Sequence, residues 1–210
     1  MAGPAKRTIV DPMKGYFKLR KRAIEILDTQ LSDKLYYHGV DHTLDVLKVV
    51  EEYITREDLD EREACLLKIG TLFHDIGFTV SNEDHEKHSA VIARKHMEEL
   101  EFAEEDIKVV EGLIAATRIP QSPKSYLDKI ICDADLDYLG RDDFWPISNS
   151  LFDELKAFGK IEDKLQWNKI QITFLQNHTY HTEFAKTHRQ PRKEERIEEL
   201  RNIVKQGIND

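Results

Sequence analysis

The chain has 210 residues, of which 40% are hydrophobic and 34% are charged. A chain of this length and composition can bury a sizeable core without disulfides, so we expect a single globular domain. The formal net charge is −9. This acidic excess argues against sequence-independent binding to the phosphates of a nucleic-acid polymer or to an anionic membrane.

The sequence shows no sign of export or of membrane insertion. No apolar run approaches the roughly 18 residues of a membrane-spanning helix, and the N-terminus lacks the apolar segment of a signal peptide. Cys65 and Cys132 lie among apolar residues without a CxxC pair, which indicates a reducing compartment and does not support a thiolate zinc site. We therefore expect a cytoplasmic protein without a membrane partner. The sequence gives no signal for the oligomeric state.

Helical periodicity extends along almost the whole chain, and no apolar–polar alternation predicts a strand. Residues 1–12, with Gly3, Pro4 and Pro12, are expected to form a flexible N-terminus. The apolar spacing predicts helices over residues 13–30, 41–54, 62–75, 85–100, 107–117, 127–139, 142–158, 163–180 and 193–206. The predicted fold class is all-α. A core domain over 13–140 is followed by C-terminal helices, 141–210, packed on the same domain.

Four short segments combine histidine with aspartate. They are residues 37–43 (YHGVDHT), 73–77 (FHDIG), 84–90 (DHEKHSA) and 132–137 (CDADLD). Imidazole nitrogens and carboxylate oxygens are a ligand set for zinc, iron, manganese, cobalt or nickel. Two histidines and two aspartates leave open positions on a six-coordinate ion, and a catalytic metal needs such positions for water.

The periodicity indicates that two of these segments point side chains inward. His42 shares a helix face with Val46, Val49 and Tyr53, so it should face the core. The pair 74–75 (HD) closes an apolar helix, where ionisable groups are costly unless they are paired or bound to metal.

The last segment offers two candidate carboxylates. Asp135 lies four residues after Ile131 on an apolar face, whereas Asp133 lines up with Lys129 and Asp137 on a polar face. Asp135 is therefore the better inward ligand. Asp133 is the competing candidate, and otherwise it should cap a helix or brace a neighbouring segment.

Taken in order, these residues resemble the H…HD…D pattern of the HD superfamily of metal-dependent phosphohydrolases. Residues 37–46 (YHGVDHTLDV) resemble the YHNxxHxxxV stretch of cyclic nucleotide phosphodiesterases, which are distant members of that superfamily. Residues 133–140 (DADLDYLG) are similar to the DAD-x-LD-x-(I/L)-G stretch of small bacterial HD proteins. The resemblance covers about residues 35–140.

The resemblance implies an HD-type helical domain that binds a divalent metal ion, whether Mn, Fe, Co, Ni, Zn or Mg. The implied ligands are His42, His74, Asp75 and Asp135. The implied catalytic residues are His38 as general acid, Asp75, which could bridge a second ion, and His85 beside the site. The implied reaction is hydrolysis of a phosphate ester of a nucleotide or related small metabolite by metal-activated water. The expected partner is thus a small phosphorylated molecule.

Three basic residues near these segments are candidates for contact with substrate phosphate: Lys87, Arg118 and Lys124. Each is also explained as an ordinary solvated charge. The segment 177–181 (NHTYH) has no accompanying carboxylate pattern, so we interpret it as helix packing or the edge of a lid.

Two other functions compete with hydrolysis. One is a diiron HD-type oxygenase, which needs additional histidines. Ala116 stands where related proteins often place another histidine, and this argues against a second tightly held metal. The other is a catalytically inactive regulatory module that binds metal or nucleotide. Such modules usually lose a ligand, whereas all four are present here.

Overall fold

The computed structural model describes residues 12–207, and over this range the chain is helical without strands, so the predicted all-α fold class is confirmed. The elements are α1 (Pro12–Gln30), α2 (Val40–Arg56), α3 (Glu61–Phe73), η1 (Ile76–Thr79), α4 (His85–Glu99), α5 (Glu104–Ala116), α6 (Tyr126–Asp135), η2 (Asp137–Gly140), α7 (Phe144–Ala157), α8 (Lys164–Asn177), α9 (Glu183–His188) and α10 (Gln190–Gln206). The expected flexible segment 1–12 lies outside the described residues, except for Pro12, where α1 begins.

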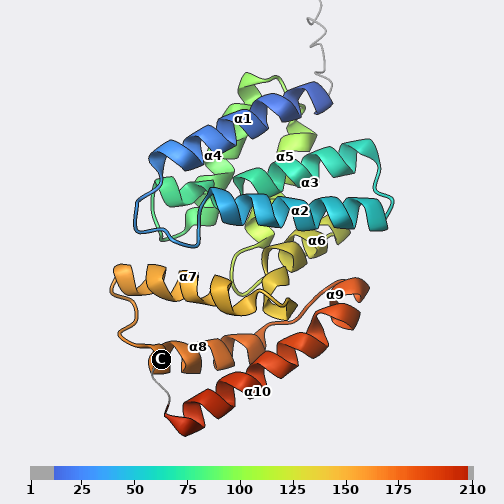
Figure 1. Ribbon diagram of the computed structural model, residues 1–210. Helices are drawn as coiled ribbons and strands as arrows, with labels where there is room; N and C mark the ends of the chain where they lie inside the picture. The colour runs from blue at the N-terminus through green and yellow to red at the C-terminus, as the bar shows by residue number, and fades with distance from the viewer. Residues whose placement is uncertain (1–11, 208–210) are drawn as a thin grey trace, which may run out of the picture.

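The helix α3 lies at the centre of the N-terminal half, where α1, α2, α4, α5 and α6 surround it (Figure 1). It begins at a capping box, in which the Asp60 side chain accepts from the Glu63 backbone N–H. From Ala64 to Phe73 nearly every side chain is buried. A helix that is apolar on all sides is stable only inside a protein, and each fully buried Leu or Phe contributes about 1.5–3 kcal/mol. The position of the C-terminal end of α3 is therefore fixed by packing.

Two apolar cores share α3. The first lies among α1, α3, α4 and α5, and the second joins α2 and α3 to α6. As a result the start of α2, the end of α3 and the end of α6 are packed as one unit.

The C-terminal helices form a second layer against η2 and the end of α6 (Figure 1). Arg189 Nε donates to the buried Asp137 Oδ1 at 2.7 Å, and the Tyr180 hydroxyl donates to the Leu136 carbonyl oxygen at 3.2 Å. The segment 177–181 begins at the last residue of α8 and continues into the connection to α9, where Tyr180 takes part in this packing. The second layer is therefore fastened at the point where α6 ends.

Several helix boundaries differ from the prediction. The helix expected over 62–75 ends at Phe73, and the chain turns into η1. The helix expected over 127–139 is interrupted at Leu136, whose backbone leaves the helical region with φ −107° and ψ 18°. The short helix α9 was not predicted, because its fixed position depends on contacts with Asp133 and Asp137 far back in the chain.

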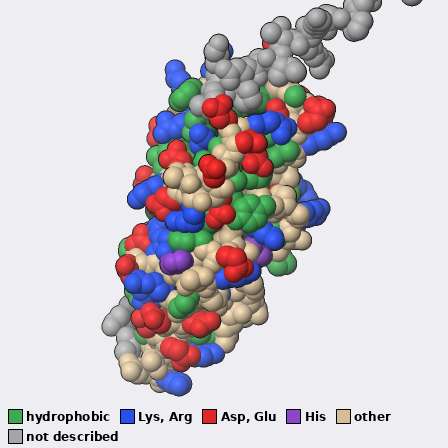
Figure 2. Space-filling view, turned by 90° about the vertical axis from the view of Figure 1, so that its right-hand side faces the viewer, with side chains coloured by type: hydrophobic (Ala, Val, Ile, Leu, Met, Phe, Trp, Pro, Cys, Tyr) green, Lys and Arg blue, Asp and Glu red, His purple; other side chains and the backbone are tan. Residues whose placement is uncertain are grey.

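One face of the protein is mixed in charge. In Figure 2, acidic and basic side chains alternate over the face that is shown. No helix within residues 12–207 is long and apolar enough to span a membrane.

The glycine at position 77 lets η1 touch the backbone of α4. Its N–H donates to the Ser89 hydroxyl at 2.8 Å, and a Cβ at this position would lie 1.9 Å from the His85 carbonyl oxygen. Since no side chain fits in this gap, Gly77 sets how closely the start of α4 approaches the end of α3.

We expect Gly77→Ala to lower the free energy of unfolding by about 2–3 kcal/mol or more, because the clash is with backbone that must move. Gly112→Ala is the matched control. Gly112 is an exposed helical residue with nothing near its missing Cβ, and its substitution should stabilise the protein by about 0.5–1 kcal/mol. Chemical denaturation of both variants measures these differences. A Gly77→Ala variant as stable as the unchanged protein would contradict the close-contact interpretation.

Candidate metal centre

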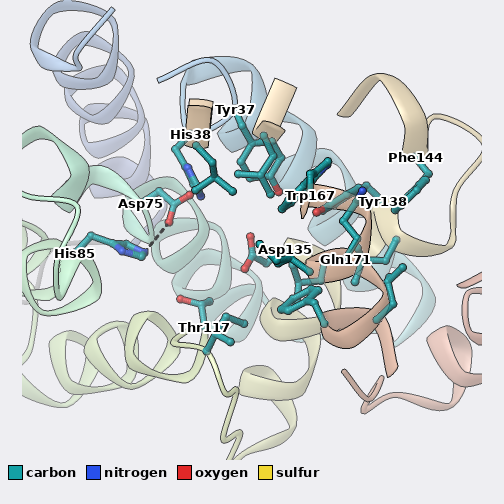
Figure 3. Close-up of a pocket in the computed structure, with 18 of the residues that line it drawn as sticks. Tyr37, His38, Asp75, His85, Thr117, Asp135, Tyr138, Phe144, Trp167 and Gln171 are labelled. Atoms are coloured by element: carbon teal, nitrogen blue, oxygen red, sulfur yellow. Dashed lines mark ion pairs between the residues drawn. The ribbon is translucent and has the colours of Figure 1, made fainter. Parts of the chain in front are cut away.

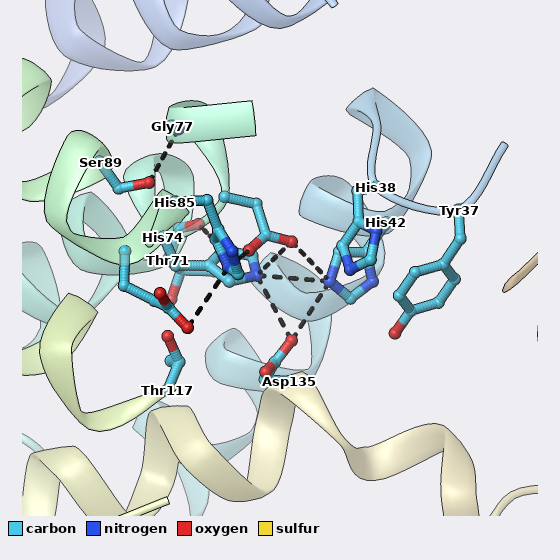
Figure 4. Close-up of polar contacts among 12 residues, drawn as sticks. Tyr37, His38, His42, Thr71, His74, Gly77, His85, Ser89, Thr117 and Asp135 are labelled. Carbon is cyan, nitrogen blue, oxygen red and sulfur yellow. Dashed lines mark hydrogen bonds and ion pairs between the residues drawn. The ribbon is translucent and has the colours of Figure 1, made fainter. Parts of the chain in front are cut away.

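Four ionisable side chains from three helix ends meet in one place, and Figure 4 labels three of them, His42, His74 and Asp135. Asp135 is half-buried, and the other three are buried. His42 is in the first turn of α2, His74 and Asp75 follow α3 directly, and Asp135 is the last residue of α6. Donor atoms of His42, His74 and Asp135 all lie within 4.8 Å of one another. The Asp135 Oδ1 atom is 3.2 Å from His42 Nε2 and 3.3 Å from His74 Nε2.

The two carboxylate oxygens of Asp75 face different histidines. Its Oδ2 lies 3.4 Å from His42 Nε2 and 3.2 Å from His74 Nε2, so Asp75 completes the cluster. Its Oδ1 lies 3.3 Å from His85 Nε2 on the other side. The structure thus brings all four predicted ligands together, with His85 directly beside them.

The tautomer of His74 is set by the backbone. Its Nδ1 lies 2.7 Å from the carbonyl oxygen of Thr71, and a carbonyl can only accept, so Nδ1 carries the hydrogen. In the neutral ring, Nε2 then presents a lone pair to the cluster. A hydrogen bond from the far ring nitrogen to a carbonyl is the usual support of a metal-binding histidine.

Opposite charges in the cluster shift each other's pKa values. Burial lowers the pKa of His42 and of His74, but the carboxylates of Asp75 and Asp135 outweigh burial and raise both values. Burial likewise raises the pKa of each carboxyl, but the histidines outweigh it and lower both. The centre of the cluster therefore favours positive charge, supplied either by protons on the histidines or by a cation between them.

The donor set fits a divalent transition metal. The His42 and His74 Nε2 atoms lie 3.3 Å apart and both face carboxylate oxygens. Mixed nitrogen and oxygen donors of this kind suit zinc, iron, manganese, cobalt or nickel, and they do not identify one metal.

The two competing aspartates at the end of α6 face in different directions. Asp133 is fully buried and accepts the backbone N–H groups of His181 at 2.8 Å and Thr182 at 2.7 Å. The face of α6 that carries Asp133, which the sequence predicted to be polar, is therefore covered by the segment that leads to α9. Asp133 holds that segment in place. Only Asp135 reaches the cluster, as the helical periodicity had indicated.

His38 is held by a glutamate that the sequence did not reveal. His38 Nδ1 lies 2.5 Å from Glu154 Oε1, and the backbone N–H groups of Tyr37 and His38 donate to Glu154 Oε2 at 2.9 and 3.0 Å. Burial raises the pKa of Glu154, but these hydrogen bonds outweigh it and lower the pKa. Glu154 lies on α7, more than a hundred residues along the chain from His38. The only local signal was a carboxylate on the same helix as several apolar residues.

Phe78 is a second residue that sequence analysis missed. Its ring stacks on His38 with centroids 4.2 Å apart and on His85 with centroids 4.0 Å apart. Phe78 therefore contacts both predicted catalytic histidines, whose own centroids lie 6.4 Å apart. It has no reactive group, so no chemical motif could have indicated it.

The three predicted phosphate-contacting residues are not brought to the cluster. Lys87 Nζ and Arg118 Nη2 both pair with Asp84, at 2.7 and 2.9 Å. Lys124 is exposed, and its side chain does not line the adjoining cavity. Instead, Thr117, the neighbour of Arg118, lines the cavity.

A cavity of about 290 Å³ opens beside the cluster (Figure 3). Its polar lining includes Asp75, Asp135, His38, His85 and Glu86. The remainder is formed mainly by α7, α8 and the segment from Leu136 through η2. Substrate bound in this cavity would lie next to the candidate metal ligands.

The order of these residues along the chain identifies a known family. Residues 39–137 match the family model described as HD domain, and the matched region contains all four clustered residues. Residues 39–137 of this chain therefore form an HD domain. HD domains bind divalent metals and are mostly metal-dependent hydrolases. Neither a curated protein nor a solved structure matched the chain. His38 and Glu154 lie outside the HD domain match, on either side of it.

We expect Asp135→Asn to impair metal binding and Asp133→Asn to impair stability. Asp135→Asn should weaken binding of Mn²⁺ by at least about 100-fold, more than a change outside the ligand set usually causes. Asp133→Asn should keep metal binding within about tenfold but lower the free energy of unfolding by about 1–3 kcal/mol, because an amide cannot accept both N–H groups. Calorimetric titration with Mn²⁺ and thermal unfolding distinguish the two. Loss of binding in Asp133→Asn alone would overturn the assignment.

Proposed function

We propose that this protein is a metal-dependent phosphohydrolase that cleaves a phosphate ester of a small molecule. The main support is the cluster of two histidines and two aspartates beside a cavity in an HD domain. His42, His74, Asp75 and Asp135 would hold a divalent ion. When bound, such an ion supplies a strong positive charge that makes water more acidic and polarises phosphate.

His38 would act as the general acid. His38 lines the cavity, and its Nδ1 is hydrogen-bonded to Glu154. The other ring nitrogen, Nε2, is therefore the one available to a bound molecule. The carboxylate fixes the orientation of the ring, so that a hydrogen on this nitrogen could be given to the leaving oxygen. Glu154 would therefore be a positioning residue that acts through His38.

His85 would contact the phosphate or hold a proton beside it. Its Nε2 is 3.3 Å from Asp75 Oδ1, so the carboxylate can orient the ring and accept a hydrogen bond from it. Phe78 keeps both histidine rings near parallel to its own, with interplanar angles of 26° to His38 and 21° to His85.

A diiron oxygenase is less well supported. At the position where such a site would need another histidine, Ala116 is buried and its carbonyl oxygen accepts from Cys132 Sγ at 3.1 Å. This residue offers no side-chain ligand to a second ion. For an inactive module that only binds metal or nucleotide, the His38–Glu154 pair beside the cluster would have no evident use.

The first test is metal add-back to chelator-treated full-length protein. We expect release of phosphate from at least one small phosphate ester after addition of Mn²⁺, Co²⁺, Ni²⁺, Zn²⁺, Mg²⁺ or Fe²⁺ separately. The panel includes aryl and alkyl phosphates, nucleotides and cyclic nucleotides. Metal that binds at the cluster without any hydrolysis would reject the phosphohydrolase proposal. Oxygen consumption with Fe²⁺ would then favour the oxygenase.

A second test concerns Glu154. We expect Glu154→Gln to lower kcat by about 10- to 100-fold with unchanged metal content, because general acid catalysis contributes at least that much. Asp153→Asn, an exposed neighbour on α7, is the matched control and should stay within about twofold. In a His38→Ala background, Glu154→Gln should have almost no further effect. An equally large additional loss there would show that Glu154 does not act through His38.

A further inference from the structure

The cavity beside the cluster has two unlike ends. In Figure 3, Asp75, His85 and His38 lie at one side, and Trp167 and Phe144 lie at the opposite side. The second side is apolar, with walls that include Leu139, Leu151, Leu155 and Phe174. A molecule that fills the cavity must therefore have one polar end and one apolar end.

The polar groups within the apolar end are already paired with one another. Gln171 Oε1 accepts from the Ser148 hydroxyl at 2.6 Å, and Gln171 Nε2 donates to Asn168 Oδ1 at 3.3 Å. Trp167 Nε1 donates to the Ser148 oxygen at 3.2 Å. A sugar hydroxyl placed here would lose its water and find few free partners, which is unfavourable.

Positive charge is scarce around the cavity. Among the described residues, neither lysine nor arginine lines it, and Lys87 and Arg118 are paired with Asp84 nearby. The charged lining consists instead of carboxylates and histidines, with Glu86 half-buried. A single phosphoryl group beside the metal ligands could be neutralised there. A second or third phosphate would be buried next to carboxylates without a countercharge.

We propose that the substrate is a phosphate monoester with an aryl or alkyl alcohol portion, which lies in the apolar end between α7 and α8. This inference rests on the proposed phosphohydrolase function for the bond that is cleaved. In that reaction the oxygen of water bonds to phosphorus and the bond from phosphorus to the ester oxygen breaks. Water loses a proton to the site, and His38 gives one to the leaving oxygen. The products are the free alcohol and inorganic phosphate.

The test measures binding separately from turnover. Methyl-, butyl-, hexyl- and octylphosphonate, which cannot be hydrolysed at an ester bond, are titrated into the full-length protein loaded with Mn²⁺. We expect the affinity to rise by about fourfold per added methylene until the cavity is filled. Hydrolysis of the matching alkyl phosphates should show the same rise in kcat/KM. Affinity independent of chain length, or tighter binding of a nucleoside diphosphate than of hexylphosphonate, would overturn the inference.

A variant in the wall of the cavity provides the second measurement. Leu151→Asn places a polar group on the half-buried face of α7 and should weaken binding of hexylphosphonate by at least about fivefold, but that of methylphosphonate by less than twofold. Val91→Asn is the matched control, because Val91 is 68% exposed on α4 and outside the cavity. Equal losses for both phosphonates in Leu151→Asn would count against the inference.

The two proposals can fail separately. Binding that depends on chain length without hydrolysis of any ester would keep the apolar binding site and reject the phosphohydrolase. Metal-dependent hydrolysis of methyl phosphate without chain-length dependence would keep the phosphohydrolase and reject the apolar substrate.

Discussion

Four ionisable side chains share one buried volume in this protein, and each is tolerable there only because the others are present. A lone carboxylate or a lone charged imidazole at such a depth would be strongly destabilising. Opposite charges at 3.2–3.4 Å compensate one another and keep a net preference for positive charge at the centre. Because these residues come from three helix ends, the compensation works only if α2, α3 and α6 keep their relative positions. The two apolar cores that share α3 meet this requirement.

Each member of the cluster is in turn held by a neighbour outside it. The Thr71 carbonyl sets the tautomer of His74, and the close contact at Gly77 determines where His85 stands. The C-terminal layer contributes as well, since it supplies Glu154 behind His38 and the backbone that Asp133 braces. The working unit is therefore larger than the matched HD domain, because α7 and the start of α9 take part in holding the site.

Sequence analysis succeeded where a local pattern had a local cause. Helical periodicity predicted the all-α fold class and favoured Asp135 as the carboxylate that reaches the cluster, whereas Asp133 is buried against the segment before α9. It failed where the cause lay far away in the chain. Glu154 is recognisable only when α7 is placed against residues 37–38, and the pairing of Arg118 with Asp84 likewise joins segments that are distant in the sequence. The end of α3 at Phe73 was misjudged for the same reason, because η1 depends on backbone contact with α4.

The aromatic stack of His38, Phe78 and His85 couples two side chains that would otherwise rotate independently. Turning either imidazole away would break its ring contact with Phe78, and Phe78 is held in turn by its contact with the second imidazole. The rotational entropy of both rings is thus lost when the protein folds and need not be lost again when a ligand arrives. The Phe78 ring takes no part in the chemistry, but its contacts make the site rigid before a ligand binds.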